Sequence, residues 1–140
     1  MAELTVAATL ENLDTVTDFV NAELERANCL PKLITQVDLA VEEIYVNIAH
    51  YAYHPETGEA TVRCEVGGDP LQVKIGFADR GRPYNPLARE DPDVAAGLEE
   101  REIGGLGVFL AKNLMDDISY QFRDGKNVLT ISKLLKKTGE

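Results

Sequence analysis

Residues 37–51 read VDLAVEEIYVNIAHY, and the rest of the chain is organised around this stretch. An α-helix turns by about 100° per residue, which places four apolar side chains in one narrow sector: Val37, Val41, Ile44 and Ile48. This sector predicts the face of an amphipathic helix that packs against a core. Pro31 suits the first turn of such a helix, and Pro55 predicts that it ends near His54.

A polar sector of the same helix lies about 120–130° away from the apolar one. It contains Gln36, Glu43, Asn47 and His50, and its far side, away from the core face, carries Leu39 and Val46 instead of further polar residues. Apolar margins on both flanks predict the wall of a ligand cavity rather than a solvated surface. Glu43 and Asn47 are one turn apart, so a proton acceptor and an uncharged oxygen ligand would face that cavity together. The alternative is a solvated face that carries a glutamate by chance.

Length and charge restrict the class of protein. A chain of 140 residues suits one domain, residues 1–140, with its own core. The formal net charge of −10 argues against direct binding to nucleic acid or to anionic membranes. No apolar run approaches the roughly 20 residues that a membrane span needs. Cys29 and Cys64 form no CxxC motif, and the lack of a signal peptide predicts reduced thiols in the cytoplasm.

Other patterns predict the elements around the central helix. Apolar periodicity predicts a helix that precedes the central one and ends near Asn28. It also predicts a short helix at residues 108–115. Alternation and β-branched residues predict strands at residues 4–10, 60–66, 71–78, 118–122 and 127–134. Residues 123–126, which read RDGK, predict a tight hairpin between the last two strands.

The first motif with chemical content is Asp79-Arg80-Gly81-Arg82-Pro83, which directly follows a predicted strand. The Asp79 carboxylate can accept a hydrogen bond from an exocyclic amino group. Gly81 has no Cβ, so a ligand could approach the backbone there closely. An ordinary β-turn built from Asp, Gly and Pro is the alternative.

A glycine cluster, Gly104-Gly105-Leu106-Gly107, opens the helix predicted at residue 108. Backbone N–H groups and the positive end of the helix dipole favour a phosphate at such a place. The cluster is neither a Walker A sequence nor a GxGxxG motif. The long acidic segment before it, residues 82–103, predicts a lid over a binding site, with a disordered insertion as the alternative.

Taken in this order, the motifs resemble the anti-sigma-factor serine/threonine kinases of the GHKL ATPase superfamily, which share the Bergerat fold. The resemblance extends from Leu10 to about Leu134, and it includes LAVEE at residues 39–43 and GGLGVFLAKNLMD at residues 104–116. It implies an α+β fold, a two-layer α/β sandwich whose mixed, mostly antiparallel sheet carries helices on one face. The chain departs from the family at Tyr51, where a histidine or arginine is common, and the sequence assigns no role to His50 or His54.

The resemblance also implies roles for individual residues. Glu43 corresponds to the general base, and Asn47 to a nucleotide contact that ligates Mg²⁺. Asp79 corresponds to the carboxylate that receives the adenine amino group, beside Gly81 in the base pocket. Residues 104–107 correspond to the backbone that approaches the ATP phosphates, and residues 82–103 to the ATP lid.

The function implied by this family is that of a cytoplasmic, ATP-binding anti-sigma regulator. It would phosphorylate a serine or threonine of a STAS-type antagonist protein and sequester a sigma factor, with ATP and Mg²⁺ as cofactors and no direct contact with nucleic acid. Such phosphoryl transfer requires positioning and charge neutralisation more than covalent help. The alternative is a nucleotide-gated protein-binding switch without kinase turnover. The sequence leaves open which sigma factor and antagonist are bound, and whether the chain forms a homodimer.

Overall fold

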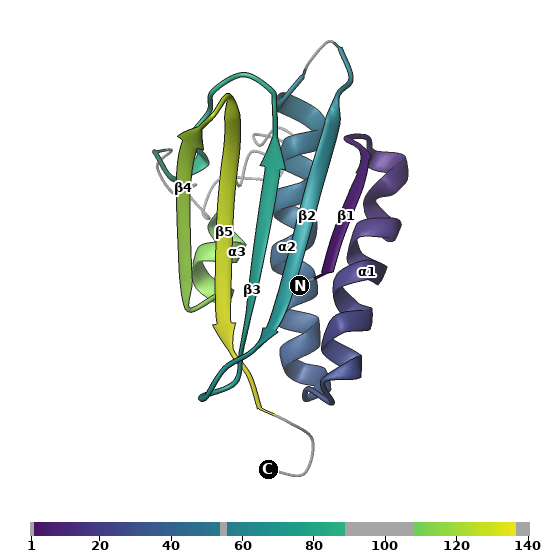
Figure 1. The fold of residues 1–140 in the computed structure, drawn as a ribbon, viewed down its shortest axis with the longest axis vertical. Helices are drawn as coiled ribbons and strands as arrows, with labels where there is room; N and C mark the ends of the chain where they lie inside the picture. The colour runs from purple at the N-terminus through teal and green to yellow at the C-terminus, as the bar shows by residue number, and fades with distance from the viewer. Residues whose placement is uncertain (1, 54–55, 89–107, 137–140) are drawn as a thin grey trace, which may run out of the picture.

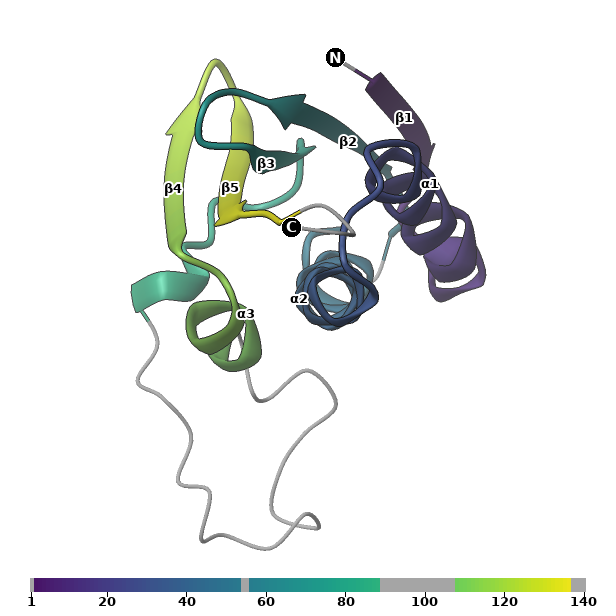
Figure 2. The same cartoon turned by 90° about the horizontal axis from the view of Figure 1, so that it is seen from below.

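A five-stranded sheet is covered on one face by helices in the computed structural model, which describes residues 2–53, 56–88 and 108–136 (Figure 1). Seen along the strands, the sheet forms one layer and the helices form the other (Figure 2). The predicted two-layer α/β sandwich is therefore confirmed. Each strand pairing in the described part of the chain is antiparallel.

The five strands lie in the order β1-β2-β3-β5-β4, so β3 is central and β1 and β4 form the edges. Their bounds are β1 Ala2–Ala7, β2 Glu59–Gly67, β3 Gln72–Asp79, β4 Asp117–Arg123 and β5 Lys126–Leu134. In the turn between β4 and β5, Asp124 and Gly125 have φ values of 55° and 77°. Two successive left-handed residues are the geometry of a tight hairpin, which confirms the turn predicted from Asp-Gly.

The helices are α1 Leu13–Arg26, α2 Pro31–Tyr51 and α3 Phe109–Leu114, with short 3-10 turns η1 Leu10–Asn12 and η2 Pro86–Ala88. Helix α2 lies between α1 and α3 (Figure 2). It ends at Tyr51 rather than near His54, which lies outside the described residues. Just after this end, the carbonyl of Ala52 accepts a hydrogen bond of 3.0 Å from the Arg82 N–H, which satisfies one of the carbonyls that a helix end leaves unpaired.

The core lies between α2 and the sheet. Val37, Val41 and Ile44 are buried and Ile48 is half-buried, so the predicted apolar face of α2 is confirmed. Burial of one such aliphatic side chain stabilises the fold by about 1.5–3 kcal/mol. None of the helices in the described ranges is both long enough and apolar enough to span a membrane.

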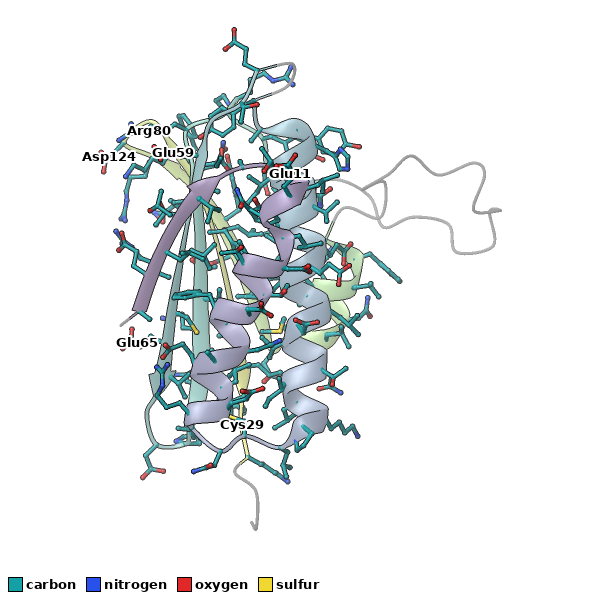
Figure 3. All side chains as sticks on the ribbon, turned by 90° about the vertical axis from the view of Figure 1, so that its right-hand side faces the viewer. Glu11, Cys29, Glu59, Glu65, Arg80 and Asp124 are labelled. Atoms are coloured by element: carbon teal, nitrogen blue, oxygen red, sulfur yellow. The ribbon has the colours of Figure 1, made fainter. Side chains whose placement is uncertain are left out.

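The side chains of β3 alternate between the open face and the helix-covered face of the sheet. Val73, Ile75 and Phe77 are buried on the covered face, and the same period of two places Asp79 there. Figure 3 shows Arg80, the next residue, close to Asp124 at one end of the sheet, whereas Cys29 lies at the opposite end of the molecule. At the end of β3, the Asp79 carboxylate therefore lies next to the apolar face that Val73, Ile75 and Phe77 form.

Candidate functional site

Three polar side chains are buried among the residues that the structure describes: Asn47 on α2, Asp79 on β3 and Asn127 on β5. All three line the same cleft. Buried polar groups are costly unless they find partners, so three of them around one opening indicate a surface built to meet a polar ligand. Two of the three, Asn47 and Asp79, are residues that the sequence analysis singled out.

The cleft has a volume of about 490 Å³, including the space open to solvent. Its walls are mainly apolar and come from α2, the sheet and the start of α3, with Ile44, Ile48, Phe77 and Leu129 among them. Tyr51, Tyr84 and Tyr120 also line it, as do the remaining residues Ala52, Arg82, Pro86 and Val108. A slot with apolar walls and a few fixed polar groups suits a flat heterocyclic ligand.

Asp79 supplies a fixed hydrogen-bond acceptor in this cleft. Its Oδ1 accepts hydrogen bonds of 2.9 Å from the backbone N–H of Gly81 and of 2.9 Å from Nδ2 of Asn127. Burial raises the pKa of Asp79, and the two hydrogen bonds act in the opposite direction. The carboxyl group is thus held in one orientation by two donors, where a ligand amino group can meet it.

Gly81 is required by close packing of the protein on itself. A Cβ at this position would lie 2.2 Å from the carbonyl oxygen of Ala52 and 2.7 Å from the Ala52 side chain. The close approach that the structure describes is to the end of α2, and it brings the Asp79–Arg82 turn against that helix. The approach of a ligand to Gly81, expected from the sequence, stays a prediction.

Glu43 lies on α2 and its side chain reaches the beginning of α3. Its Oε2 accepts a hydrogen bond of 2.9 Å from the backbone N–H of Leu110. That its carboxylate faces the nucleotide cavity beside Asn47 stays a prediction. The unpaired N–H groups of a helix start attract a carboxylate, and this attraction turns the side chain toward α3.

The ionisation of Glu43 is also perturbed. Burial raises the pKa of Glu43 to about 7, while the backbone N–H groups of Phe109, Leu110 and Ala111 act in the opposite direction. Its Oε1 is buried and has no hydrogen-bond partner among the described residues. A carboxylate with a pKa near neutrality and one uncommitted oxygen has the properties of a general base.

Asn127 is the site residue that the sequence analysis missed. The sequence pattern could have identified it, because Asn127 falls in the same alternation as Leu129 and Ile131 on the buried face of β5. A polar residue at a position predicted to be buried is a candidate site residue. Several other predicted site residues, Gly104, Gly105, Leu106 and Gly107, lie outside the described residues. The same holds for most of the predicted lid, from residue 89 onward.

The fold and the cleft together define a class: a two-layer domain with a cleft between helix and sheet at one end of its central strand. Residues 6–133 match the family model described as the histidine kinase-like ATPase domain. The chain belongs to this family. The match covers the central helix, the Asp79 turn and the glycine cluster, so the family predicted from these motifs is confirmed.

Curated relatives of known name narrow the class further. The serine-protein kinase RsbW of Listeria monocytogenes is 31% identical over 120 residues, which span 82% of this chain and 75% of that protein. The serine/threonine-protein kinase BtrW of Bordetella bronchiseptica is 32% identical over 94 residues, or 67% of this chain and 66% of that protein. The predicted enzyme class, a serine/threonine protein kinase, is confirmed by these relatives.

A solved structure shows the same fold. The structure of the RsbU and RsbW domains of Rv1364c from Mycobacterium tuberculosis matches with a TM-score of 0.67 at 17% identity. The match covers 96% of this chain but 33% of that one. The present chain therefore spans about a third of the solved protein, and the likeness concerns the fold.

Proposed function

We propose that the cleft binds the adenine ring of ATP and that the chain is an ATP-dependent serine/threonine protein kinase. The observation that carries this proposal is the buried Asp79 carboxylate, which accepts hydrogen bonds at the end of an apolar slot. An ionised carboxylate only accepts hydrogen bonds, so it suits the adenine amino group and opposes the carbonyl oxygen of guanine. The apolar walls suit the faces of the ring.

Asn47 and Glu43 supply the chemistry at the triphosphate end of this proposal. Asn47 is buried, lines the cleft and lies one turn of α2 from Glu43. A side-chain amide oxygen is a hard ligand suited to Mg²⁺, which takes few protein ligands and otherwise keeps water and phosphate oxygens. Asn47 would hold the ion, which neutralises phosphate charge when bound, and Glu43 would orient or deprotonate the incoming hydroxyl.

The glycine cluster and the preceding segment complete the proposed site. Residues 104–107 would approach the phosphates through their backbone, and residues 82–103 would close over the nucleotide as a lid. In this proposal residues 1–140 form one ATP-binding domain. Support comes from the match to an ATPase domain family over residues 6–133.

The proposed partners follow from the family resemblance and from the relatives named RsbW. The chain would act in the cytoplasm, phosphorylate a STAS-type antagonist protein and sequester a sigma factor, so that phosphorylation decides which partner it holds. The net charge of −10 is consistent with protein partners that carry basic surfaces rather than with nucleic acid.

Transfer of label from γ-labelled ATP to a co-purified STAS-type protein tests the proposal. The expected result is Mg²⁺-dependent labelling of a serine or threonine, strongly reduced in Asp79→Ala at ATP concentrations below saturation. If the chain binds a partner only in the presence of ATP but transfers no label to any candidate, the alternative of a nucleotide-gated switch replaces the kinase. If ATP does not bind at all, both fail.

A further inference from the structure

The Asn127 side chain is hydrogen-bonded to Asp79, to the backbone of the segment after β3 and to Tyr120 on β4. It lies directly opposite Asp79 in the register of β3 and β5, and it is 8% exposed. Its Nδ2 donates to Oδ1 of Asp79 at 2.9 Å and to the backbone carbonyl of Arg82 at 2.9 Å, with the Gly81 carbonyl farther away at 3.4 Å. Its Oδ1 accepts from the backbone N–H of Tyr84 at 3.1 Å and from the hydroxyl of Tyr120.

The orientation of this amide follows from the chemistry of its partners. The NH₂ group faces only acceptors, namely one carboxylate and two carbonyl oxygens. The oxygen faces a backbone N–H and a hydroxyl, both of which donate. Exchange of the two ends would place oxygen against oxygen at Asp79 and leave the N–H of Tyr84 facing an NH₂ group. One orientation therefore satisfies both ends of the side chain.

This amide decides which oxygen of Asp79 can reach a ligand. Oδ1 already accepts from Asn127 and from the N–H of Gly81, which leaves Oδ2 to accept from a group in the cleft. The two donors also keep the carboxyl plane from rotating about the Cβ–Cγ bond. The same Asn127 side chain holds the backbone at Arg82 and Tyr84, and both of these residues line the cleft.

We propose that Asn127 is a positioning residue that makes the cleft selective for a base with an exocyclic amino group, by presenting Oδ2 of Asp79 to it. This inference rests on the proposed function, in which Asp79 receives the adenine amino group. Asn127 acts through Asp79 and needs no contact with the nucleotide. A purely structural residue at the same place would support binding of every nucleotide alike.

The experiment compares two nucleotides that differ at one group. Mg-ATP carries the 6-amino group, and the Mg²⁺ complex of purine riboside 5′-triphosphate lacks it. In Asn127→Leu, which keeps a similar volume but no polar atoms, the affinity for Mg-ATP should fall by about tenfold or more. The affinity for the purine riboside nucleotide should stay near that of the wild type, so the ratio of the two affinities falls by about tenfold.

Two further variants make the test robust. Tyr120→Phe removes the hydroxyl that holds the oxygen of Asn127 but keeps the ring in the cleft wall, so the same ratio should fall, though by less. Asn113→Leu is the matched control, because Asn113 is exposed on α3 and its side-chain amide donates to the carbonyl of Phe109, outside the cleft lining. Its ratio should equal that of the wild type.

Each outcome decides the inference. An equal loss of affinity for both nucleotides in folded Asn127→Leu, or an unchanged ratio, overturns it and leaves the proposed function intact. If Asn127→Leu does not fold, an unchanged ratio in Tyr120→Phe overturns it. If the wild type does not distinguish the two nucleotides, Asp79 does not recognise the amino group, and this inference falls together with the proposed adenine site.

Discussion

Glu43 on α2 and Leu110 on α3 are joined by a hydrogen bond of 2.9 Å, in which the backbone N–H of Leu110 donates to Oε2 of Glu43. The residue proposed as the general base therefore also holds the first turn of α3. In the sequence, α3 follows directly on the glycine cluster at residues 104–107. A substitution at Glu43 has to separate the catalytic role from this supporting role.

Replacement of Glu43 by glutamine separates them. The side-chain carbonyl oxygen of the glutamine can still accept the Leu110 N–H, but it has no useful proton affinity. We expect transfer of phosphate to the antagonist to fall by about 10²–10⁴-fold, the usual contribution of a general base, with little change in ATP affinity. Glu43→Ala is the matched variant that loses the α3 contact as well, and its unfolding free energy should fall by about 1 kcal/mol. Transfer by Glu43→Gln at the wild-type rate would show that Glu43 is not the base.

The same carboxyl predicts a pH dependence of stability. Its pKa is about 7 in the folded protein, against 4.5 for an unperturbed glutamate. Between these values the folded state binds more protons than the unfolded state, so the free energy of unfolding falls as pH rises. Relative to Glu43→Gln, the wild type should lose stability from about pH 4.5 to about pH 7 and then level off. Urea unfolding of both proteins across this range measures the difference, and parallel curves would contradict the assignment.

Replacement of Asp79 by alanine should weaken ATP binding by roughly 10- to 100-fold, because a hydrogen bond to a charged group contributes about 1.5–3 kcal/mol. The structure adds a second effect. The N–H of Gly81 and the amide of Asn127 lose their acceptor, so stability should fall by about 1–3 kcal/mol while the fold persists. Calorimetric titration with ATP and GTP, together with thermal melting, tests both effects. Equal binding of ATP and GTP by the wild type would rule out the assignment.

Gly81→Ala should disturb the turn after β3. Its new Cβ would lie 2.2 Å from the carbonyl oxygen of Ala52, so the turn or the end of α2 must shift, at a cost of about 1–3 kcal/mol. Gly76→Ala, within β3 itself, is the control, because a Cβ there meets nothing within 4 Å. Chemical denaturation of the two variants should show a loss of stability only for Gly81→Ala. A neutral Gly81→Ala would mean that the turn does not depend on this contact.

Mg-ATP should stabilise the folded chain. At a free nucleotide concentration about 100-fold above the dissociation constant, linkage predicts a gain of about 2.7 kcal/mol. The melting temperature should rise accordingly with Mg-ATP and much less in Asp79→Ala. The absence of any shift at millimolar Mg-ATP would contradict the proposed site.

Much of the fold could be predicted because its signals are local. The apolar period of residues 37–48 specifies the face of α2 that packs on the sheet, and its burial confirms that prediction. Asp-Gly at residues 124–125 specifies a tight hairpin, because these residue types tolerate positive φ. The capping contact at the end of α2 could not be predicted in the same way, because the Arg82 N–H that donates to the Ala52 carbonyl comes from a turn distant in the sequence.

The sequence by itself determined which residues are candidates for the functional site: a glutamate and an asparagine one helical turn apart, and an aspartate at the end of a buried strand. Only the tertiary structure decided what these residues touch. Asn127 meets Asp79 across 48 residues of chain because β3 and β5 pair in one particular register. Glu43 meets Leu110 across 67 residues because α3 packs beside α2. Hydrogen bonds act over about 3 Å, so they depend on the packing of distant segments, which no local pattern encodes.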